Sequence, residues 1–206
     1  MVKKLDNYKR LGTTIHDALG EAFDKTAKLL NIGFPGGPMI EKLAKKGDKN
    51  RFLLPKPIYN RGGSNLSFAG LKTAILRVKD SIKTYQDKCD LAASFQKTIV
   101  EILIKKTQKA IEQYLEYYPK NKILVVAGGV AANQEIRKNL KKLCQKQNFK
   151  IYFPDVKLCT DNAAMIALAG LERYKKGKFS NHNFAVNPRW QLDSKARFMK
   201  GAGVKI

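Results

Sequence analysis

The sequence predicts an α/β fold, and three features of residues 122–176 support this class. Ile123–Val126 is a short apolar run of strand type, and Gly128–Gly129 separates it from a helical pattern. Ile151–Phe153 is a second run of strand type, and another helical pattern follows it. A strand–helix–strand–helix order is typical of parallel strands with helices packed on the sheet.

The same periodicities predict the other elements. Thr160-Asp161-Asn162 is expected to cap the last helix, which runs to about Tyr174 with Gly177 behind it. Upstream we expect a strand over Asn7–Thr14, a helix opened by Asp17 and stopped near Gly33, helical turns over Met39–Lys46, a helix over Leu71–Asp80 and a long amphipathic helix capped by Asp90.

Composition bounds the class of protein. Hydrophobic residues make up 44% of the 206 residues, which is enough for a buried core. No apolar run approaches a membrane span and the start lacks a secretory signal, so we expect a cytoplasmic protein without a membrane partner. The net charge of +23 favours a polyanion such as nucleic acid, although a lysine excess spread over solvated helix faces has the same signature.

Few residues suit a metal site built from soft ligands. The three cysteines form no CxxC pair, and His16 and His182 are the two histidines in the sequence. A four-thiolate zinc site and a histidine-rich site are therefore not expected within this chain. A metalloprotease motif of the HExxH type is also absent from the sequence.

Two segments at predicted helix starts have the composition of binding loops. Gly128–Gly129 lets the backbone come close to a ligand and precedes a helix start suited to a phosphate or hydroxyl, but the spacing alone slightly favours a plain tight connection in an α/β fold. Asp161 follows a strand and opens a helix, where a carboxylate either binds a metal or caps the helix.

Two further segments have the same ambiguity. Glu21 and Asp24 share one helix face, which points either to a ligand or to solvent. The small-residue loop Ser67–Thr73 enters a helix, and a structural role is the better interpretation for it.

Five short segments together resemble the tRNA threonylcarbamoyladenosine-forming transferase family, known as TsaD or Gcp and also described as glycoprotease-like. They occur in the family's order and at family-like intervals: GEAFDK (20–25), FPGGP (34–38), SFAGLKT (67–73), AGGVAAN (127–133) and CTDNAAM (159–165). The resemblance covers the carboxyl-terminal part of the family.

The resemblance implies a fold and its boundaries. Members resemble actin-like ATPases, with two ribonuclease-H-like lobes and nucleotide in the cleft between them. Residues 1–190 would be the carboxyl-terminal lobe with a helical insertion, and 191–206 a basic tail. The HxxxH segment of the first lobe and the first two strands of the second lobe, which carry SGGHT, have no counterpart here.

The resemblance also implies the chemistry. Members transfer a threonylcarbamoyl group from threonylcarbamoyl-AMP to the adenosine 3′ of the anticodon in tRNAs that read codons beginning with A. Asp24, Gly37, Glu41 and Asn133 match positions of the adenylate pocket, and Asp161 matches a ligand of one iron or zinc ion. No nucleophilic side chain is implied, because the mixed anhydride supplies the driving force.

The missing segments leave the role of this chain open. A separate polypeptide supplies the first lobe, or the chain is an inactive product, or it binds tRNA or a partner without catalysis. Expected partners are tRNA, threonylcarbamoyl-AMP, TsaB-like and TsaE-like helper proteins and a chain that carries the missing lobe. Without two strands, the sheet is expected to expose an unpaired edge and an apolar face.

Overall fold

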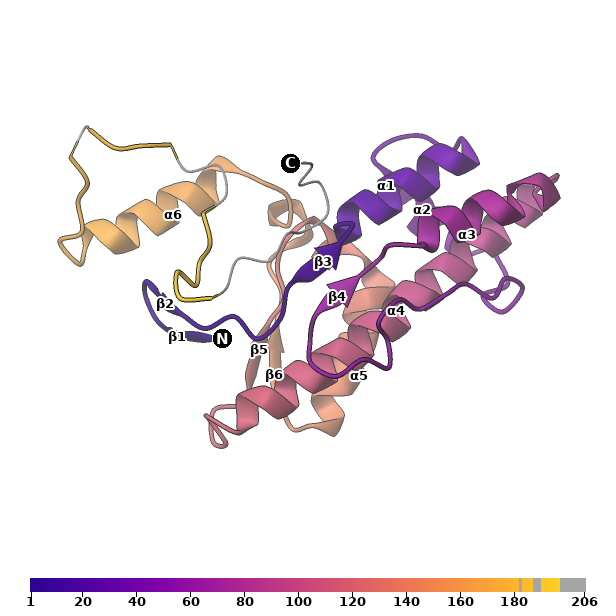
Figure 1. Cartoon of the computed structure of the whole chain (residues 1–206). Helices are drawn as coiled ribbons and strands as arrows, with labels where there is room; N and C mark the ends of the chain where they lie inside the picture. The colour runs from indigo at the N-terminus through magenta and orange to yellow at the C-terminus, as the bar shows by residue number, and fades with distance from the viewer. Residues whose placement is uncertain (182, 187–189, 197–206) are drawn as a thin grey trace.

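The longest element, helix α4 (Tyr85–Leu115), runs through the middle of the molecule (Figure 1). The computed structural model describes residues 1–181, 183–186 and 190–196. Helix α2 (Gly36–Ala44) packs on α4 and on α1 (Leu19–Leu30), and α1 also contacts α3 (Leu71–Val78). Helix α5 (Gln134–Lys146) packs on another part of α4. None of the helices in these residues is long and apolar enough to cross a membrane.

Three pairs of short strands accompany the helices. The first pair is antiparallel, β1 (Val2–Lys4) with β2 (Asn7–Tyr8), and the second is parallel, β3 (Thr14–His16) with β4 (Leu66–Ser67). The third is parallel, with β5 (Ile123–Val125) beside β6 (Lys150–Tyr152) and α5 between them in sequence. The fold is thus mixed helix and sheet, and the predicted strand–helix–strand order is confirmed.

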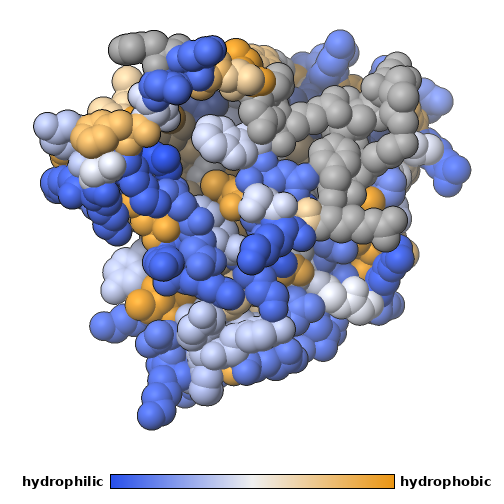
Figure 2. All heavy atoms as spheres, turned by 60° about the vertical axis from the view of Figure 1, so that its left-hand side comes forward, coloured by the Kyte–Doolittle hydropathy of each residue, from blue (hydrophilic) through white to orange (hydrophobic). Residues whose placement is uncertain are grey.

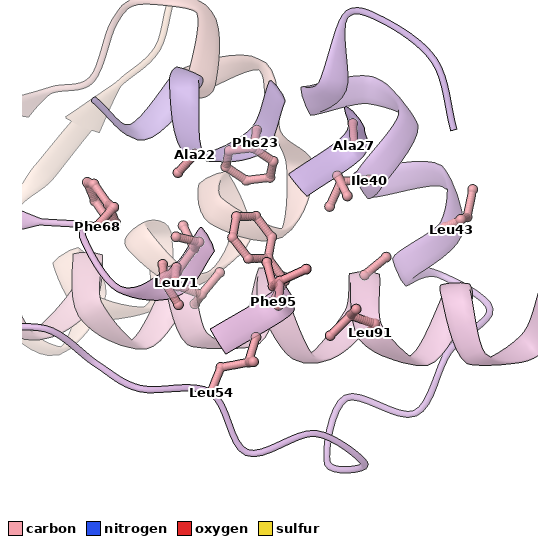
Figure 3. Close-up of a cluster of buried hydrophobic side chains, with 14 of the residues drawn as sticks. Ala22, Phe23, Ala27, Ile40, Leu43, Leu54, Phe68, Leu71, Leu91 and Phe95 are labelled. Carbon is pink, nitrogen blue, oxygen red and sulfur yellow. The ribbon is translucent and has the colours of Figure 1, made fainter. Parts of the chain in front are cut away.

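The main core lies between α4 and the helices α1, α2 and α3. Phe95 of α4 meets Phe23 of α1 edge to face, with ring centroids 5.2 Å apart and planes at 89°. In Figure 3 these rings point toward each other, among Leu71, Ile40 and Leu91. A smaller cluster joins α4 to α5 and the following chain through Ile111, Leu143, Cys144 and Phe149.

Helix α4 begins earlier than predicted. Thr84 is its N-cap, and the Thr84 and Asp87 side chains each accept a bond from the other's backbone N–H. Asp90, predicted as the cap, is a buried residue inside the helix, so that prediction was wrong. Its carboxylate instead binds the backbone N–H of Asp48 at 2.7 Å and the guanidinium of Arg51 at 2.7 Å.

Other predicted boundaries shift by a few residues. The strand expected over residues 7–14 is two strands, β2 and β3, with an irregular stretch between them. Helix α1 starts at Leu19, because Asp17 has a left-handed φ of 50°. The helical turns expected over Met39–Lys46 belong to α2, which begins earlier, at Gly36, and carries Pro38 in its first turn, where a proline is tolerated.

Helix α6 (Ala163–Tyr174) ends where predicted, but it lacks a packed face. Asn162, rather than Asp161, caps it by accepting a bond from the Met165 N–H at 3.0 Å. All twelve residues are exposed, including Leu168 at 61%, and Figure 1 shows the helix set apart from the others. Figure 2, which brings that side forward, shows a mostly hydrophilic face broken by several hydrophobic areas.

Two short stretches complete the description. The 3-10 turn η3 (Val156–Leu158) leads toward α6, and Arg10 binds the carboxylate of Asp193 through its backbone N–H at 2.8 Å. His182, Pro188 and residues 197–206 of the expected basic tail lie outside the described residues.

Truncation of Phe95 should show how much the main core contributes to the free energy of unfolding. We expect Phe95→Ala to lower the free energy of unfolding by about 3–5 kcal/mol, because it removes a fully buried ring. Leu53→Ala is the control, since that side chain is 97% exposed and should change stability by less than about 0.5 kcal/mol. Urea unfolding followed by circular dichroism measures both; equal midpoints would contradict the assignment of the core.

The α4 N-terminus should make stability depend on pH. The backbone N–H groups of Thr84 and Lys83, the Thr84 hydroxyl and Arg51 hold the pKa of the Asp87 carboxyl well below its usual 3.8. A lowered folded-state pKa stabilises the fold above the unfolded value, and that contribution is lost as the pH falls below about 3.9.

We therefore expect the urea midpoint to drop below about pH 4. Asp87→Asn should lower the midpoint at pH 7 and flatten this acid branch. Asp80→Asn, at an exposed position in the preceding turn, should keep the wild-type profile. Parallel acid branches for Asp87→Asn and the wild type would show that another group is responsible.

Candidate functional site

Asp24 and the two glycines of the 34–38 segment lie together where α1 meets α2. The Asp24 carboxylate Oδ1 accepts the backbone N–H of Gly36 at 2.7 Å, which satisfies one of the free N–H groups at the start of α2. The second oxygen, Oδ2, has no hydrogen-bond partner among the described residues. One oxygen of Asp24 therefore serves the fold and the other remains available.

The two glycines differ in their surroundings. A Cβ on Gly36 would lie 2.6 Å from the Phe23 carbonyl oxygen and 2.7 Å from the Asp24 Cα, so only a glycine fits there. A Cβ on Gly37 would meet nothing within 4 Å. Gly36 is thus required for packing, whereas Gly37 presents open backbone.

Glu41 and Asn133 both serve the start of α5. The Glu41 Oε1 accepts the backbone N–H of Gln134 at 3.0 Å, and the Asn133 Oδ1 accepts that of Ile136 at 3.0 Å. The Asn133 amide nitrogen donates to the Gln96 Oε1 at 2.8 Å, within the core side of α4. Asn133 is buried, and its oxygen and amide group are both engaged, so it fixes the position of α5.

The glycine pair 128–129 stands open between β5 and the turn η2 (Gly129–Ala132). Gly128 has φ 94°, a conformation that favours glycine, and a Cβ on either residue would meet nothing within 4 Å. Both residues are exposed. Exposed backbone at this turn is able to donate to an anionic or hydroxylated ligand.

These segments adjoin each other through their elements. Helix α1 contacts both α2 and η2, and Glu41 of α2 reaches the first residue of α5. The four predicted binding residues therefore lie on neighbouring elements: Asp24, Gly37, Glu41 and Asn133. More than 100 residues separate Asp24 from Asn133 along the chain. A cavity of about 540 Å³ borders this group between α2, α4 and α5, lined in part by Glu41, Gln96 and Gln134.

Three partners in this group had no local signal in the sequence. Gln96 sits within a long helix, Gln134 follows Asn133, and Gly36 resembles its neighbour Gly37. Their roles come from contacts 12 to 93 residues apart along the chain. No periodicity or motif spacing encodes such contacts.

Arg137 ties the glycine turn to the segment that precedes Asp161. Its guanidinium donates to the carbonyl of Ala131, to that of Pro154 at 2.8 Å and to the Cys159 sulfur at 3.2 Å. Cys159 is buried. This link places the 159–162 segment on the same side of α5 as the glycine turn.

Asp161 itself is exposed, and no hydrogen bond joins its carboxylate to another described residue. Within the described ranges, no three histidine, cysteine, aspartate or glutamate side chains gather as a metal site would require. A tightly held metal ion needs several protein ligands, so Asp161 does not by itself fit the metal that the family resemblance implies.

Comparisons with known proteins agree on one family. The family described as tRNA N6-adenosine threonylcarbamoyltransferase matches residues 1–168. A protein of that name from Pelagibacter ubique is 60% identical over 207 residues, which cover 100% of this chain and 58% of that protein. A protein of the same name from Ruegeria sp. (strain TM1040) is 49% identical over 97% of this chain. Another from Rickettsia rickettsii (strain Sheila Smith) is 51% identical over 92% of this chain. In both cases 56% of the relative is covered. The chain thus spans just over half the length of these relatives.

The neighbouring glycines provide a matched pair of variants. We expect Gly36→Ala to lower the free energy of unfolding by about 1–3 kcal/mol, because the new methyl group overlaps the backbone of α1. Gly37→Ala should leave it unchanged or raise it by up to about 1 kcal/mol, since the methyl group has space and alanine favours the helix. Thermal and urea unfolding measure both; a destabilised Gly37→Ala would show that this position is not open.

Proposed function

Because the chain belongs to the tRNA N6-adenosine threonylcarbamoyltransferase family, we propose that it forms the carboxyl-terminal part of a tRNA-modifying transferase. The complete enzyme would move a threonylcarbamoyl group from threonylcarbamoyl-AMP to the adenosine 3′ of the anticodon in tRNAs that read codons beginning with A. The observation that carries this proposal is the family match, which includes the Asp24, Gly37 and Asn133 segments that adjoin in the fold.

The adenylate site would use the free groups around α2 and the glycine turn. Open backbone at Gly37 and Gly128 allows close approach of a ribose or phosphate. The unpartnered oxygens of Asp24 and Glu41 are suited to accept hydrogen bonds from ribose hydroxyl groups. Asn133 would act by fixing the start of α5 beside them.

The transfer depends on how the donor and the adenosine amine are positioned, and it does not require a reactive side chain. The exocyclic amine of adenosine attacks the carbamoyl carbon of the mixed anhydride, the bond to the phosphate oxygen breaks, and AMP leaves while the amine loses a proton. Holding the donor in one orientation removes much of the entropic barrier of such a bimolecular step. The residues around α2 would contribute this orientation.

The metal would be shared with polypeptide outside this chain. One divalent ion, iron or zinc, is what the family resemblance implies, and Asp161 is the ligand that this chain offers. We propose that its remaining ligands come from the part of the enzyme that corresponds to the unmatched portion of the relatives. Residues 1–190 would then be most of an actin-like, ribonuclease-H-like lobe, and 191–206 a basic tail.

The net charge of +23 supports a tRNA substrate, and binding should weaken as salt rises. TsaB-like and TsaE-like helper proteins, a cytoplasmic location and a separate chain for the missing lobe complete the proposal. The alternative is a catalytically inactive remnant that binds only tRNA or a partner. The isolated position of Asp161 favours this alternative for the chain acting by itself.

Reconstitution tests the proposed activity. The chain, mixed with the preceding part of the Pelagibacter ubique relative, should modify tRNA when given threonylcarbamoyl-AMP labelled in its threonine, and the chain alone should not. Gly37→Val should slow the modification at least tenfold, a loss of about 1.4 kcal/mol of transition-state stabilisation. Its fold should remain intact, because a Cβ at this position meets nothing within 4 Å.

Gly62→Val is the matched control, since its Cβ also meets nothing within 4 Å and it lies in a loop remote in sequence from the site segments. Equal rates for the two variants would argue against Gly37 in the adenylate site. Efficient modification by the chain alone would contradict the need for further polypeptide.

A further inference from the structure

Helix α5 presents a row of lysines to solvent. Its apolar side chains are buried, and the helix packs on α4 and β6. The opposite side carries exposed lysines at the spacings of three and four residues that share one helix face. This lysine row consists of Lys138, Lys141, Lys142 and Lys146. Glu135 is the one acidic residue in α5, so the helix is strongly basic.

The lysine row lacks acidic partners. No salt bridge joins its ammonium groups to a carboxylate in the part of the chain that the structure describes. Glu135 instead accepts a hydrogen bond from the Asn139 side-chain amide at 2.8 Å. By contrast, α1, α4 and α6 each pair a lysine with a glutamate three or four residues away on the same helix.

The row is electrostatically unfavourable for the free helix. Lys138 lies three residues before Lys141 and four before Lys142, and like charges at these spacings repel each other. Lys142 in turn lies four residues before Lys146. The helix dipole favours a cation only within the last turn, so it accounts for Lys146 and not for the other three. A bound polyanion would relieve the repulsion, because it would place negative charge beside each ammonium group.

The chemistry of this face suits a nucleic acid more than a protein. No large hydrophobic side chain is exposed among residues 134–146, all of which the structure describes. The other exposed positions of the helix are Gln134 and Gln145. Protein–protein interfaces have an apolar or aromatic centre and are depleted in lysine, whereas nucleic-acid interfaces are polar and basic. Lysine binds phosphate oxygens as a point charge.

The row begins beside the candidate adenylate site and leads away from it. Lys138 lines the same cavity as Glu41 and Gln134. Asn133 caps α5, and an α-helix rises by about 1.5 Å per residue. Lys138 therefore lies about 8 Å along the helix axis from the cap, and Lys146 about 20 Å. A strand of nucleic acid held along the row would have one end at the site.

We propose that the lysine row binds the phosphate backbone of tRNA next to the anticodon and so directs the target adenosine to the adenylate site. The inference rests on the proposed function in one respect, namely that tRNA is the substrate. It adds the surface that holds the tRNA and the direction in which the strand lies. The adenosine would lie near the start of α5, and nucleotides farther from it would lie toward Lys146.

Salt-dependent binding tests the row on the chain by itself, with a fluorescently labelled tRNA that reads a codon beginning with A. Lys138→Gln/Lys142→Gln removes two charges and keeps Lys141, whose Nζ lies 5.9 Å from the centroid of the Phe153 ring. The double variant should raise the Kd at least tenfold at low salt. The slope of log K against log salt should become shallower by about 1.8, since each phosphate contact contributes about 0.9.

Two matched variants separate the row from the general charge of the protein. Lys79→Gln/Lys83→Gln removes the same charge from exposed positions before α4, and should raise the Kd by less than about threefold. Lys138→Arg/Lys142→Arg keeps the charge of the row, and should bind within about threefold of the wild type. Circular dichroism checks that each variant is folded.

Cross-linking tests the direction of the strand. All three native cysteines are buried, so a thiol-specific photo-crosslinker should attach to a single added cysteine on the surface. From Lys138→Cys, the cross-links should fall closest to the target adenosine. From Lys146→Cys they should fall farther along the strand, because about 12 Å of helix separates the two positions.

Several results would overturn the proposal. If the chain binds no tRNA, or if the row and control glutamine variants lose binding equally, the row has no special part in tRNA binding. Displacement of tRNA by poly-glutamate as readily as by unlabelled tRNA would indicate an acidic protein as the partner. Cross-links in the reverse order would contradict the direction of the strand.

The two proposals fail in different ways. Binding through the row without modification, even when the preceding part of the Pelagibacter ubique relative is present, would uphold this proposal and count against the proposed activity. Modification at an unchanged rate and KM by Lys138→Gln/Lys142→Gln would overturn this proposal and uphold the activity.

Discussion

The burial of α4 is the constraint on which the rest of the structure depends. Its Phe95 fills the space between α1, α2 and α3. Its carboxyl-terminal half, which includes Ile111, packs against α5 and the β5–β6 pair. A helix enclosed on several sides fixes where its neighbours begin, because their apolar faces must meet it. The positions of Asp24, Gly37 and Asn133 follow from this packing. Asp24 binds the first residue of α2, Gly37 lies in the first turn of α2 and Asn133 caps α5, and both α2 and α5 contact α4.

The helix ends also explain how the candidate site is built. The first N–H groups of α2 and α5 need acceptors. Asn133 supplies one as a local N-cap of α5, whereas Asp24 and Glu41 supply the others from 12 and 93 residues away, which no local pattern encodes. Two of these residues, Asp24 and Glu41, keep a second oxygen free. One side chain is then able both to hold a helix in place and to meet a ligand at that helix, which is an economical way to make a rigid site.

The sequence predicts elements that have strong local patterns. Its predictions are wrong where contacts with residues distant along the chain determine a helix boundary or the role of a side chain. The β5 and β6 strands and the end of α6 at Tyr174 are read directly from apolar runs and turn residues. The predicted start of α4 is wrong, because Asp90 has the residue type of a cap but lies buried inside the helix. Its carboxylate accepts hydrogen bonds from the Asp48 backbone N–H and the Arg51 guanidinium. The different roles of Gly36 and Gly37 are likewise invisible in sequence, since they depend on the approach of the α1 backbone.

Helix α6 stands without a packed face, and this bears on its helix–coil equilibrium. Twelve residues are about the length at which an isolated helix is only marginally formed in water. The Asn162 cap contributes about 1 kcal/mol, and the apolar side chains contribute little while they are solvated. A partner that covered Ile166 and Leu168 would therefore also raise the helical population of this segment, and its binding would be coupled to local folding of α6.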